Sequence, residues 1–293
     1  MSILIDADTR VICQGMTGRA GTHYSAAMIE YGTRVVGGVR PGKGGSRHLD
    51  LPVFDTVAQA MDETNANASM VFVPPDHAAA AMIEAIEAET PLIVALTERV
   101  PLHDMIRVRD ALQETKTVLI GPNSQGILAP GLCKIGVMAT GSARKGNVGI
   151  ISRSASLTSE VVAQLSAAGL GQSTSVGIGG DPIHGLAMRD CFKLFLADPD
   201  THGVVLVGEI GGREEEELAE FIAAENAGMP VVALIVGRHA PTRRRMGHSG
   251  AIIQDAVSSA EGKIRALADA GVSIAESPHL VGETMRRAML VAA

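Results

Sequence analysis

The chain has 293 residues, of which 46% are hydrophobic and 2% aromatic, and its formal net charge at pH 7 is −7. This length suggests two domains that each bury a core, and no apolar run approaches the roughly 18 residues of a membrane-spanning helix. The acidic balance and the scarcity of aromatic side chains argue against the basic, stacking surface of a nucleic-acid-binding protein.

The amino-terminal sequence MSILIDADTR has neither the basic segment nor the long apolar core of a secretion signal, so we expect a cytoplasmic protein. The cysteines Cys13, Cys133 and Cys191 are far apart and form no CxxC pair. Cys13 lies in an apolar, strand-like run, which predicts a buried core position. The histidines are scattered without the spacing of metal ligands, and we therefore expect no metal site.

Short β-branched runs alternate with alanine-rich stretches through the first 123 residues. The runs predict strands at 10–15, 34–39, 69–75, 91–97 and 117–123, and the stretches between them predict helices at 21–32, 77–89 and 105–114. This alternation is typical of a parallel sheet that is covered by helices.

The sequence QGMTGRAG follows the first predicted strand and opens the first predicted helix, with glycines at 15, 18 and 21. Glycines in this position let the backbone approach a phosphate, which the amino terminus of the helix attracts. The second strand ends with Arg40 and Lys43 rather than with the acid of a nicotinamide enzyme. These cations favour an extra phosphate, as in coenzyme A or NADP; a solvated basic loop is the alternative.

Residues 121–146 are rich in glycine and proline and predict a linker that carries a loop site. The alternation then resumes, with strands predicted at 147–152, 173–179, 203–210 and 230–237 and helices at 156–169, 213–228, 259–271 and 279–293. We therefore divide the chain into a Rossmann-like domain at 1–130, a linker at 131–145 and a second parallel α/β domain at 146–293.

The second half offers the groups that a phosphorylated-histidine mechanism needs. His248 lies in the glycine loop RRRMGHSGAI and could act as a nucleophile, and Glu209, at the end of a strand, could fix its tautomer. Ser154 and Ser156 begin a helix at the carboxyl end of another strand, where ligands gather. The alternatives are a surface histidine and a simple helix cap, and the REEEE run reads as a solvated helix start without chemistry.

Together these segments resemble the α subunits of succinyl-CoA synthetase, also called succinate–CoA ligase. The resemblance runs in order from residue 1 to about 270 and includes VVGGV, PGKGG, GQSTSVGIGGDPI, GEIGG and RMGHSGAII. It implies a Rossmann-like domain that binds coenzyme A, followed by a flavodoxin-like ligase domain. It also implies an enzyme of the tricarboxylic acid cycle that forms succinyl-CoA reversibly with consumption of a nucleoside triphosphate.

The resemblance also implies roles for individual residues. In that family succinyl phosphate forms, the phosphoryl group passes to the histidine that corresponds to His248, Glu209 steadies that ring, and the thiol of coenzyme A takes the acyl group. Coenzyme A contacts are implied for Thr17, Gly18, Arg19, Ala20, Lys43, Leu96, Thr97 and Glu98, and phosphate contacts for Ser154, Ala155 and Ser156. An ATP-grasp β subunit, in an αβ or α2β2 assembly, would carry ATP or GTP and Mg²⁺.

Three departures from the family pattern cluster where the acid is expected to bind. Asn123 is followed by Ser124 and Gln125 where the family has cysteine and proline, and Ala155 and Ser156 replace glycine and threonine. Ser159 replaces a tyrosine that contacts substrate in the family. The added hydrogen-bonding groups could favour an acid that carries a hydroxyl. Succinate, malate and another substituted dicarboxylate therefore stay open. A coenzyme A or nucleotide sensor without turnover is a second class of function, and an NADP dehydrogenase is disfavoured.

Overall fold

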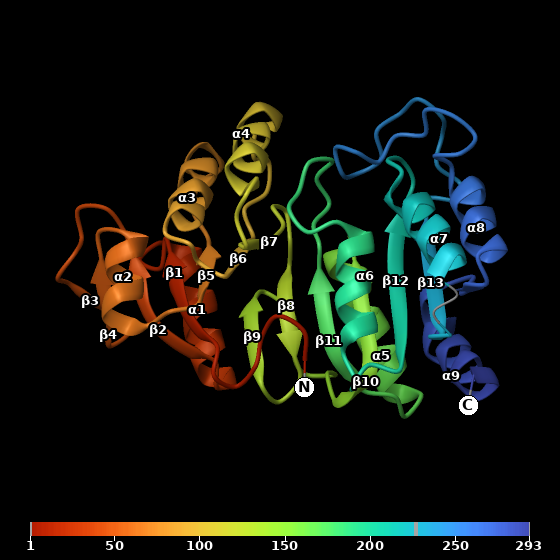
Figure 1. Ribbon diagram of the computed structural model, residues 1–293, viewed down its shortest axis with the longest axis horizontal. Coiled ribbons are helices and arrows are strands. Elements are labelled where there is room, and N and C mark those ends of the chain that lie inside the picture. Colours follow the sequence, from red (N-terminus) through yellow and green to blue (C-terminus); the bar gives the residue numbers. More distant parts are fainter. Residues whose placement is uncertain (1, 226–227, 293) are drawn as a thin grey trace.

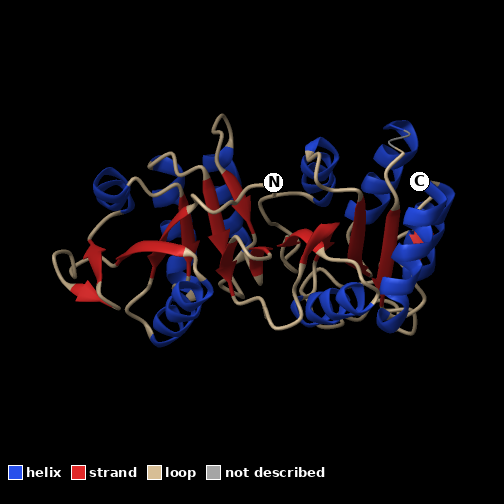
Figure 2. Cartoon of the chain, turned by 90° about the horizontal axis from the view of Figure 1, so that it is seen from below, coloured by secondary structure: helices blue, strands red, loops and turns tan. Residues whose placement is uncertain are grey.

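Two seven-stranded sheets lie side by side along the long axis of the molecule, the first built from the amino-terminal half of the chain (Figure 1). Helices lie on both faces of the strands (Figure 2). The computed structural model describes residues 2–225 and 228–292. The predicted alternation of strands and helices is confirmed in both halves.

The first sheet has the strand order β3-β4-β2-β1-β5-β6-β7. Apart from the antiparallel β3–β4 ribbon at its edge, all of its neighbouring strands run parallel. The six parallel strands follow the order 3-2-1-4-5-6, which is that of the Rossmann fold. Its elements are β1 (Arg10–Gln14), α1 (Arg19–Tyr31), β2 (Arg34–Val39), β3 (Arg47–His48), β4 (Leu51–Phe54), α2 (Val57–Thr64), β5 (Ala68–Val71), α3 (Pro75–Glu87), β6 (Leu92–Ala95), α4 (Leu102–Leu112) and β7 (Val118–Ile120).

The second sheet has the order β14-β13-β12-β10-β11-β8-β9. Its five parallel strands follow the flavodoxin order 2-1-3-4-5, as the resemblance implied. The elements are β8 (Gly126–Ala129), β9 (Cys133–Gly136), β10 (Lys145–Ser152), α5 (Ala155–Ala167), β11 (Gln172–Gly177), α6 (Met188–Ala197), β12 (Gly203–Glu209), α7 (Glu214–Glu225), β13 (Val231–Val236), α8 (Ala260–Asp269), β14 (Ser273–Ile274), the 3₁₀ turn η1 (Pro278–Leu280) and α9 (Val281–Ala292).

Two predicted helices reach beyond the described part of the chain. The helix predicted at 213–228 corresponds to α7, and its positions 226 and 227 lie outside the described residues. The helix predicted at 279–293 corresponds to η1 and α9, and position 293 also lies outside them.

The segment expected to be a linker contains regular structure. Strands β8 and β9 pair with each other, and β8 pairs antiparallel with β11, so the hairpin extends the second sheet. Gly126 and Gly136 face each other across the hairpin, and a side chain at Gly126 would come within 1.9 Å of the Ile135 carbonyl oxygen. The glycines that suggested a loop therefore serve a close approach of two backbones.

The halves are tied together by the hairpin and by the amino-terminal segment. The Thr33 hydroxyl, which follows α1, donates to the Lys134 carbonyl at 2.9 Å and accepts from the Lys134 N–H at 3.0 Å. The Ile3 N–H donates to the Thr174 hydroxyl of β11 at 3.2 Å. Thr33 thereby satisfies both backbone groups of a buried strand residue.

All three cysteines are free and buried. Cys13 is fully buried in β1, which confirms the predicted core position. Burial raises the pKa of the Cys13 and Cys133 thiols to about 12, and it raises the pKa of the Cys191 thiol as well. None of these thiols is therefore activated as a nucleophile.

Each sheet has one topological switch point, where ligands bind in open α/β proteins. In the first sheet it lies between β1 and β5, just beyond the glycine loop. In the second sheet it lies between β10 and β12, where Ser152 and Glu209 end the two strands. The parallel strands thus bring residues from distant parts of the sequence to two adjacent edges.

We predict that Thr33→Val destabilises the chain by about 1–3 kcal/mol, because it leaves the buried N–H and C=O of Lys134 without partners. Urea unfolding measures this change. The control is Thr115→Val, where an exposed hydroxyl donates only to the Leu112 carbonyl; we expect a change within about 0.5 kcal/mol there. Equal effects of the two substitutions would contradict the role of Thr33.

Candidate functional site

The loop after β1 requires its glycines. Gly15 has φ +88°, and a side chain on it would come within 2.5 Å of the Phe72 carbonyl oxygen. A side chain on Gly21 would come within 2.1 Å of the Gly15 carbonyl oxygen. The loop therefore packs directly against both β5 and the first turn of α1, and it leaves backbone N–H groups at the helix amino terminus facing the switch point.

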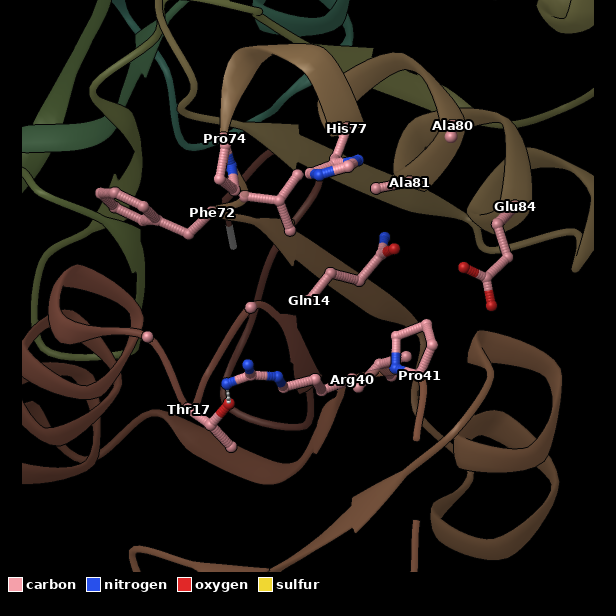
Figure 3. A pocket seen from close by; sticks show the side chains of 14 residues that line it. Gln14, Thr17, Arg40, Pro41, Phe72, Pro74, His77, Ala80, Ala81 and Glu84 are labelled. Carbon is pink, nitrogen blue, oxygen red and sulfur yellow. Dashed lines mark hydrogen bonds between the residues drawn. The ribbon is translucent and has the colours of Figure 1, made fainter. Parts of the chain in front are cut away.

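A cavity of about 610 Å³ lies at this switch point. Figure 3 shows Gln14, at the end of β1, extending between Arg40 and His77. Arg40 follows β2, and His77 belongs to α3, which carries Glu84 further along. The Arg40 guanidinium donates to the Thr17 hydroxyl at 2.6 Å (Figure 3). An arginine beside a helix amino terminus suits a phosphorylated ligand.

Two further cavities continue this row toward the second half. A cavity of about 370 Å³ shares Phe72 and Val73 with the first cavity. A third, of about 460 Å³, shares Glu98 and Asn123 with the second and reaches His248. The cavities thus follow one another from the glycine loop to the histidine.

The predicted contacts for coenzyme A divide into three groups in the structure. Thr17 and Gly18 line the first cavity, and Leu96, Thr97 and Glu98 line the second. Arg19 and Ala20 begin α1 and are exposed, and Lys43 is exposed in the turn after β2. These last three residues do not line the three cavities.

His248 and Glu209, predicted as a pair from the sequence, are in contact. His248 lies in the loop 237–259, which passes over the carboxyl-terminal side of the second sheet (Figure 1). Its Nδ1 lies 2.9 Å from Oε1 and 2.8 Å from Oε2 of Glu209. Because a carboxylate only accepts hydrogen bonds, Nδ1 carries the hydrogen, and Nε2 of a neutral ring keeps its lone pair.

The ring of His248 packs against a glycine. A side chain on Gly180 would come within 2.5 Å of Cε1 and Nε2 of the ring, so no larger residue fits there without moving it. The side chain of His248 is 28% exposed, whereas that of Glu209 is 11% exposed. The carboxylate is therefore shielded, while the ring stays accessible from the cavity.

Arg153 joins this pair to a second one. Its Nε donates to Glu209 Oε1 at 3.2 Å, and its Nη1 donates to Glu214 Oε2 at 3.2 Å. The other oxygen of Glu214 lies 3.1 Å from Nε2 of the buried His184. The guanidinium of Arg153 stays positively charged. Its hydrogen bonds therefore hold the carboxylates of Glu209 and Glu214 in place.

The REEEE run is not a solvated helix start. Glu215 and Glu216 are buried, and both bind the ammonium of Lys263, while Glu214 binds Arg153 and His184. The prediction failed because glutamates in the first turn of a helix are usually explained by the helix dipole. Only the fold brings Lys263 and Arg153 to them.

The pKa of His248 is raised from its ordinary value, first by the hydrogen bond to Glu209 and then by the charges of Glu209 and Asp181, against partial burial and the charge of Arg153. The charged ring therefore stabilises the fold below its unfolded pKa, and this contribution is lost as the pH rises through the folded pKa. The neutral, nucleophilic ring accumulates above the folded pKa.

Two other carboxyl groups near His248 have shifted pKa values. Burial raises the pKa of Asp181, although a 3.0 Å hydrogen bond from the Asn123 amide opposes the shift. Burial also acts to raise the pKa of Glu214, but the hydrogen bond and charge of His184 and the charge of Arg153 outweigh it and lower the pKa. Glu214 therefore stays ionised beside Arg153.

At the start of α5, Ala155 lines one of the three cavities, whereas Ser154, Ser156 and Ser159 do not. Ser154 caps the helix by accepting from the Leu157 N–H at 3.4 Å. Ala155 lines the second cavity, whereas Ser156 and Ser159 are exposed and do not line the three cavities. The structure thus does not bring Ser159 to the predicted acid site.

Asn123, Ser124 and Gln125 all line the second cavity, and each forms a side-chain hydrogen bond within the chain. The Ser124 hydroxyl donates to the Gly177 carbonyl and accepts from the Gly126 N–H at 2.8 Å. The Gln125 amide nitrogen donates to the Thr158 hydroxyl at 2.6 Å. These groups hold the start of the hairpin against β11 and α5.

Sequence reasoning missed Arg153, Asp181 and Glu214 as members of this cluster. Arg153 stands in the SRSAS segment and Asp181 in the GGDPI segment, both of which were noticed for other reasons. The sequence signal that could have identified such residues is a polar side chain shortly after a buried strand, since these side chains meet at the carboxyl edge of a parallel sheet.

Within the described residues, no cluster of three or more histidine, cysteine, aspartate or glutamate side chains is arranged to hold a metal ion. Among the helices that the structure describes, none combines the length and the apolar character needed to cross a membrane.

Comparison with known proteins adds two family matches. Residues 6–99 match the family described as CoA binding domain, and residues 151–274 match the family described as CoA-ligase. The first match contains the glycine loop and all of the residues that line the first cavity. The second contains Glu209, Arg153 and His248.

Similar curated proteins span nearly the whole chain. The succinate–CoA ligase [ADP-forming] subunit alpha of Aquifex aeolicus is 46% identical, over 99% of this chain and 96% of the relative's length. The succinate–CoA ligase [ADP-forming] subunit alpha 1 of Archaeoglobus fulgidus is 47% identical, over 99% of both chains.

Similar solved structures support the fold. ATP citrate lyase from Methanosaeta concilii, in complex with (3S)-citryl-CoA, superposes with a TM-score of 0.90 at 22% identity. The superposition covers 99% of this chain but only 51% of that one, so the present chain spans about half of the lyase. A dinucleotide-forming acetyl-coenzyme A synthetase from Ca. Korarchaeum cryptofilum has a TM-score of 0.78 at 18% identity, over 96% of this chain and 61% of that one.

We predict that Glu209→Gln lowers the pKa of His248, because it removes the negative charge and weakens the hydrogen bond that raise it. An NMR titration of the imidazole measures the shift, with His248→Asn identifying the signal. The matched control is Glu217→Gln, which removes an exposed carboxylate from the first turn of α7, the helix that follows β12. A pKa that is unchanged by Glu209→Gln would contradict the assigned contact.

Proposed function

We propose that this chain, which belongs to the family of succinate–CoA ligase α subunits, uses His248 to carry a phosphoryl group between a nucleotide and an acid. As a member of that family it is the α subunit of an acid–CoA ligase that forms a nucleoside diphosphate. The contact between Nδ1 of His248 and Glu209 carries the proposal, because it leaves Nε2 as the nucleophile.

The proposed phosphoryl transfer has two balanced steps. Nε2 of neutral His248 attacks the γ-phosphorus of the nucleotide, so that an N–P bond forms, the bridging P–O bond breaks and the diphosphate leaves. A carboxylate oxygen of the acid then attacks the phosphorus, the N–P bond breaks, and an acyl phosphate and neutral His248 result. Both steps reverse.

Glu209 supports these steps by holding the ring. Its carboxylate keeps the proton on Nδ1 and stabilises the positive charge that the ring acquires as the N–P bond forms. Arg153 fixes Glu209 from the other side at 3.2 Å and also binds Glu214. The cluster thus orients the imidazole toward the third cavity.

We place coenzyme A along the first and second cavities. The glycine loop, the amino terminus of α1 and Arg40 fit its phosphates, while Leu96, Thr97 and Glu98 line the path toward His248. When bound, coenzyme A supplies the thiol that accepts the acyl group. The functional division that follows is 1–130 for coenzyme A, 131–145 as the connection and 146–293 for ligation, although β8 and β9 belong structurally to the second sheet.

The partner in this reaction is a β subunit, as family membership implies; we propose that it has an ATP-grasp fold and supplies ATP or GTP with Mg²⁺. The loop next to His248 suits contact with such a partner, because Arg243, Arg244, Arg245 and Met246 are all exposed. Because the reaction uses nucleotide and coenzyme A, we place it in the cytoplasm. A coenzyme A sensor without turnover would need neither His248 nor Glu209.

Succinate is the acid that we propose. The Ser124 hydroxyl and the Gln125 amide nitrogen, which could have bonded a substrate hydroxyl, are engaged within the chain. Arg99 and Arg245 line the third cavity beside His248, and neither forms an ion pair with a residue that the structure describes. These cations suit a dicarboxylate.

Incubation of the reconstituted α and β subunits with γ-labelled ATP tests the proposed function. We expect acid-labile, base-stable label on the α chain, and we expect none on His248→Asn. His239→Asn, which changes an exposed histidine of the same loop, should retain the label. Label that persists in the His248→Asn variant would overturn the mechanism.

We predict that Arg40→Gln weakens binding of coenzyme A by about tenfold, because a charge-assisted contact to phosphate is lost. Isothermal titration measures the dissociation constant. Arg34→Gln is the control, since Arg34 begins the same strand that Arg40 follows and pairs with Asp8 on the exposed surface. Equal losses for both variants would argue against a cofactor contact at Arg40.

A panel of dicarboxylic acids tests the proposed substrate. We expect the reconstituted enzyme to show its highest kcat/KM with succinate, because the Ser124 hydroxyl donates to the Gly177 carbonyl and the Gln125 amide nitrogen to the Thr158 hydroxyl rather than to a substrate hydroxyl group. A clear preference for malate would instead favour the substituted-acid alternative.

A further inference from the structure

Lys263 of α8 is fully buried and uses all three of its ammonium hydrogens. Its Nζ lies 2.6 Å from Glu215 Oε2, 2.8 Å from Glu216 Oε2 and 3.3 Å from the Gly212 carbonyl oxygen. An ammonium group has three donors, and all of them point to a single short segment. That segment is the turn and first helical residues that follow Glu209.

The ion pair continues to the backbone of Glu209. The second carboxylate oxygen of Glu215, Oε1, accepts from the Glu209 N–H at 3.0 Å. Gly208 leaves room for this contact, since a side chain on it would come within 2.6 Å of Glu215 Oε1. Lys263 is thereby connected through Glu215 to the residue that holds His248.

The charges buried around Glu209 explain why the connection from Lys263 through Glu215 matters for the orientation of Glu209. Glu209, Glu214, Glu215 and Glu216 carry four negative charges, and two buried cations, Arg153 and Lys263, face them. Burial lowers the pKa of Arg153, but the nearby negative charges of Glu215, Glu209 and Glu214 outweigh this effect and raise the pKa. Glu215 is thus near enough to compete for Arg153 if Lys263 does not hold it.

We propose that Lys263 is a positioning residue for the phosphoryl-transfer reaction: through Glu215 it fixes the end of β12 so that Glu209 holds Nδ1 of His248. The inference rests on the proposed function for the role of His248 in catalysis. Lys263 itself touches neither His248 nor the cavities, and α8 lies beyond the loop 237–259 in the chain. Its influence on the reaction therefore passes through the segment that begins at Glu209.

Two variants and one control test this proposal in the full chain. Lys263→Met removes the ammonium, and Lys263→Met combined with Glu216→Gln removes one positive and one negative charge, which preserves the buried charge balance. Lys193→Met is the control, since Lys193 pairs with Asp190 on the exposed surface of α6. Circular dichroism confirms that each variant is folded before it is compared.

The first readout is the pKa of His248 from an NMR titration. The charged groups that face its ring are Glu209 of β12, Arg153 after β10 and Asp181 after β11. We expect the pKa to fall in both Lys263 variants, because the hydrogen bond that His248 Nδ1 donates to Glu209 weakens, and to stay unchanged in the control. A folded double variant with the pKa of the unmodified chain overturns the proposal.

The second readout is the rate at which His248 takes label from γ-labelled ATP in the reconstituted complex. A lower pKa alone would increase the neutral fraction of the ring and speed transfer. We expect a rate about tenfold lower instead, because misorientation of a reacting group is costly. An unchanged or faster rate overturns the proposal. If the unmodified chain takes no label, the proposed function fails, while the pKa readout still decides the role of Lys263.

Discussion

The contact between Nδ1 of His248 and the carboxylate of Glu209 is the interaction on which the proposed chemistry depends. A histidine can act as a phosphoryl carrier only when one ring nitrogen is free and the other is held. The chain achieves this by placing a buried carboxylate at the end of β12 and a partly exposed ring in the loop above it. The loop residue is thereby oriented by a residue at the end of a buried strand.

The fold serves this interaction by bringing two strand edges together. The switch point of the Rossmann-like sheet forms the first cavity, and the switch point of the flavodoxin-like sheet lies beside Glu209 and Arg153. Residues that line successive cavities, such as Phe72 and Asn123, connect the two regions. The site that we propose for coenzyme A and the proposed phosphoryl carrier therefore lie along one row of cavities.

The sequence predicts the parts of this architecture that follow from local pattern. Buried β-branched runs predict most of the parallel strands, and the position of Glu209 at a strand end predicts a contact with His248. The edge ribbon β3–β4 and the hairpin β8–β9 were missed, because strands of two to four residues with flanking glycines look like loops. Long-range ion pairs, above all Lys263 with Glu215, cannot be read from spacing, since only tertiary folding joins α8 to α7.

The most direct test of the account is the position of the phosphoryl group on His248. Phosphorus NMR of the chain after reaction with ATP and the β subunit distinguishes the two ring nitrogens. Because Glu209 occupies Nδ1, the account predicts phosphorylation at Nε2. A phosphoryl group on Nδ1, or on a residue other than His248, would contradict it.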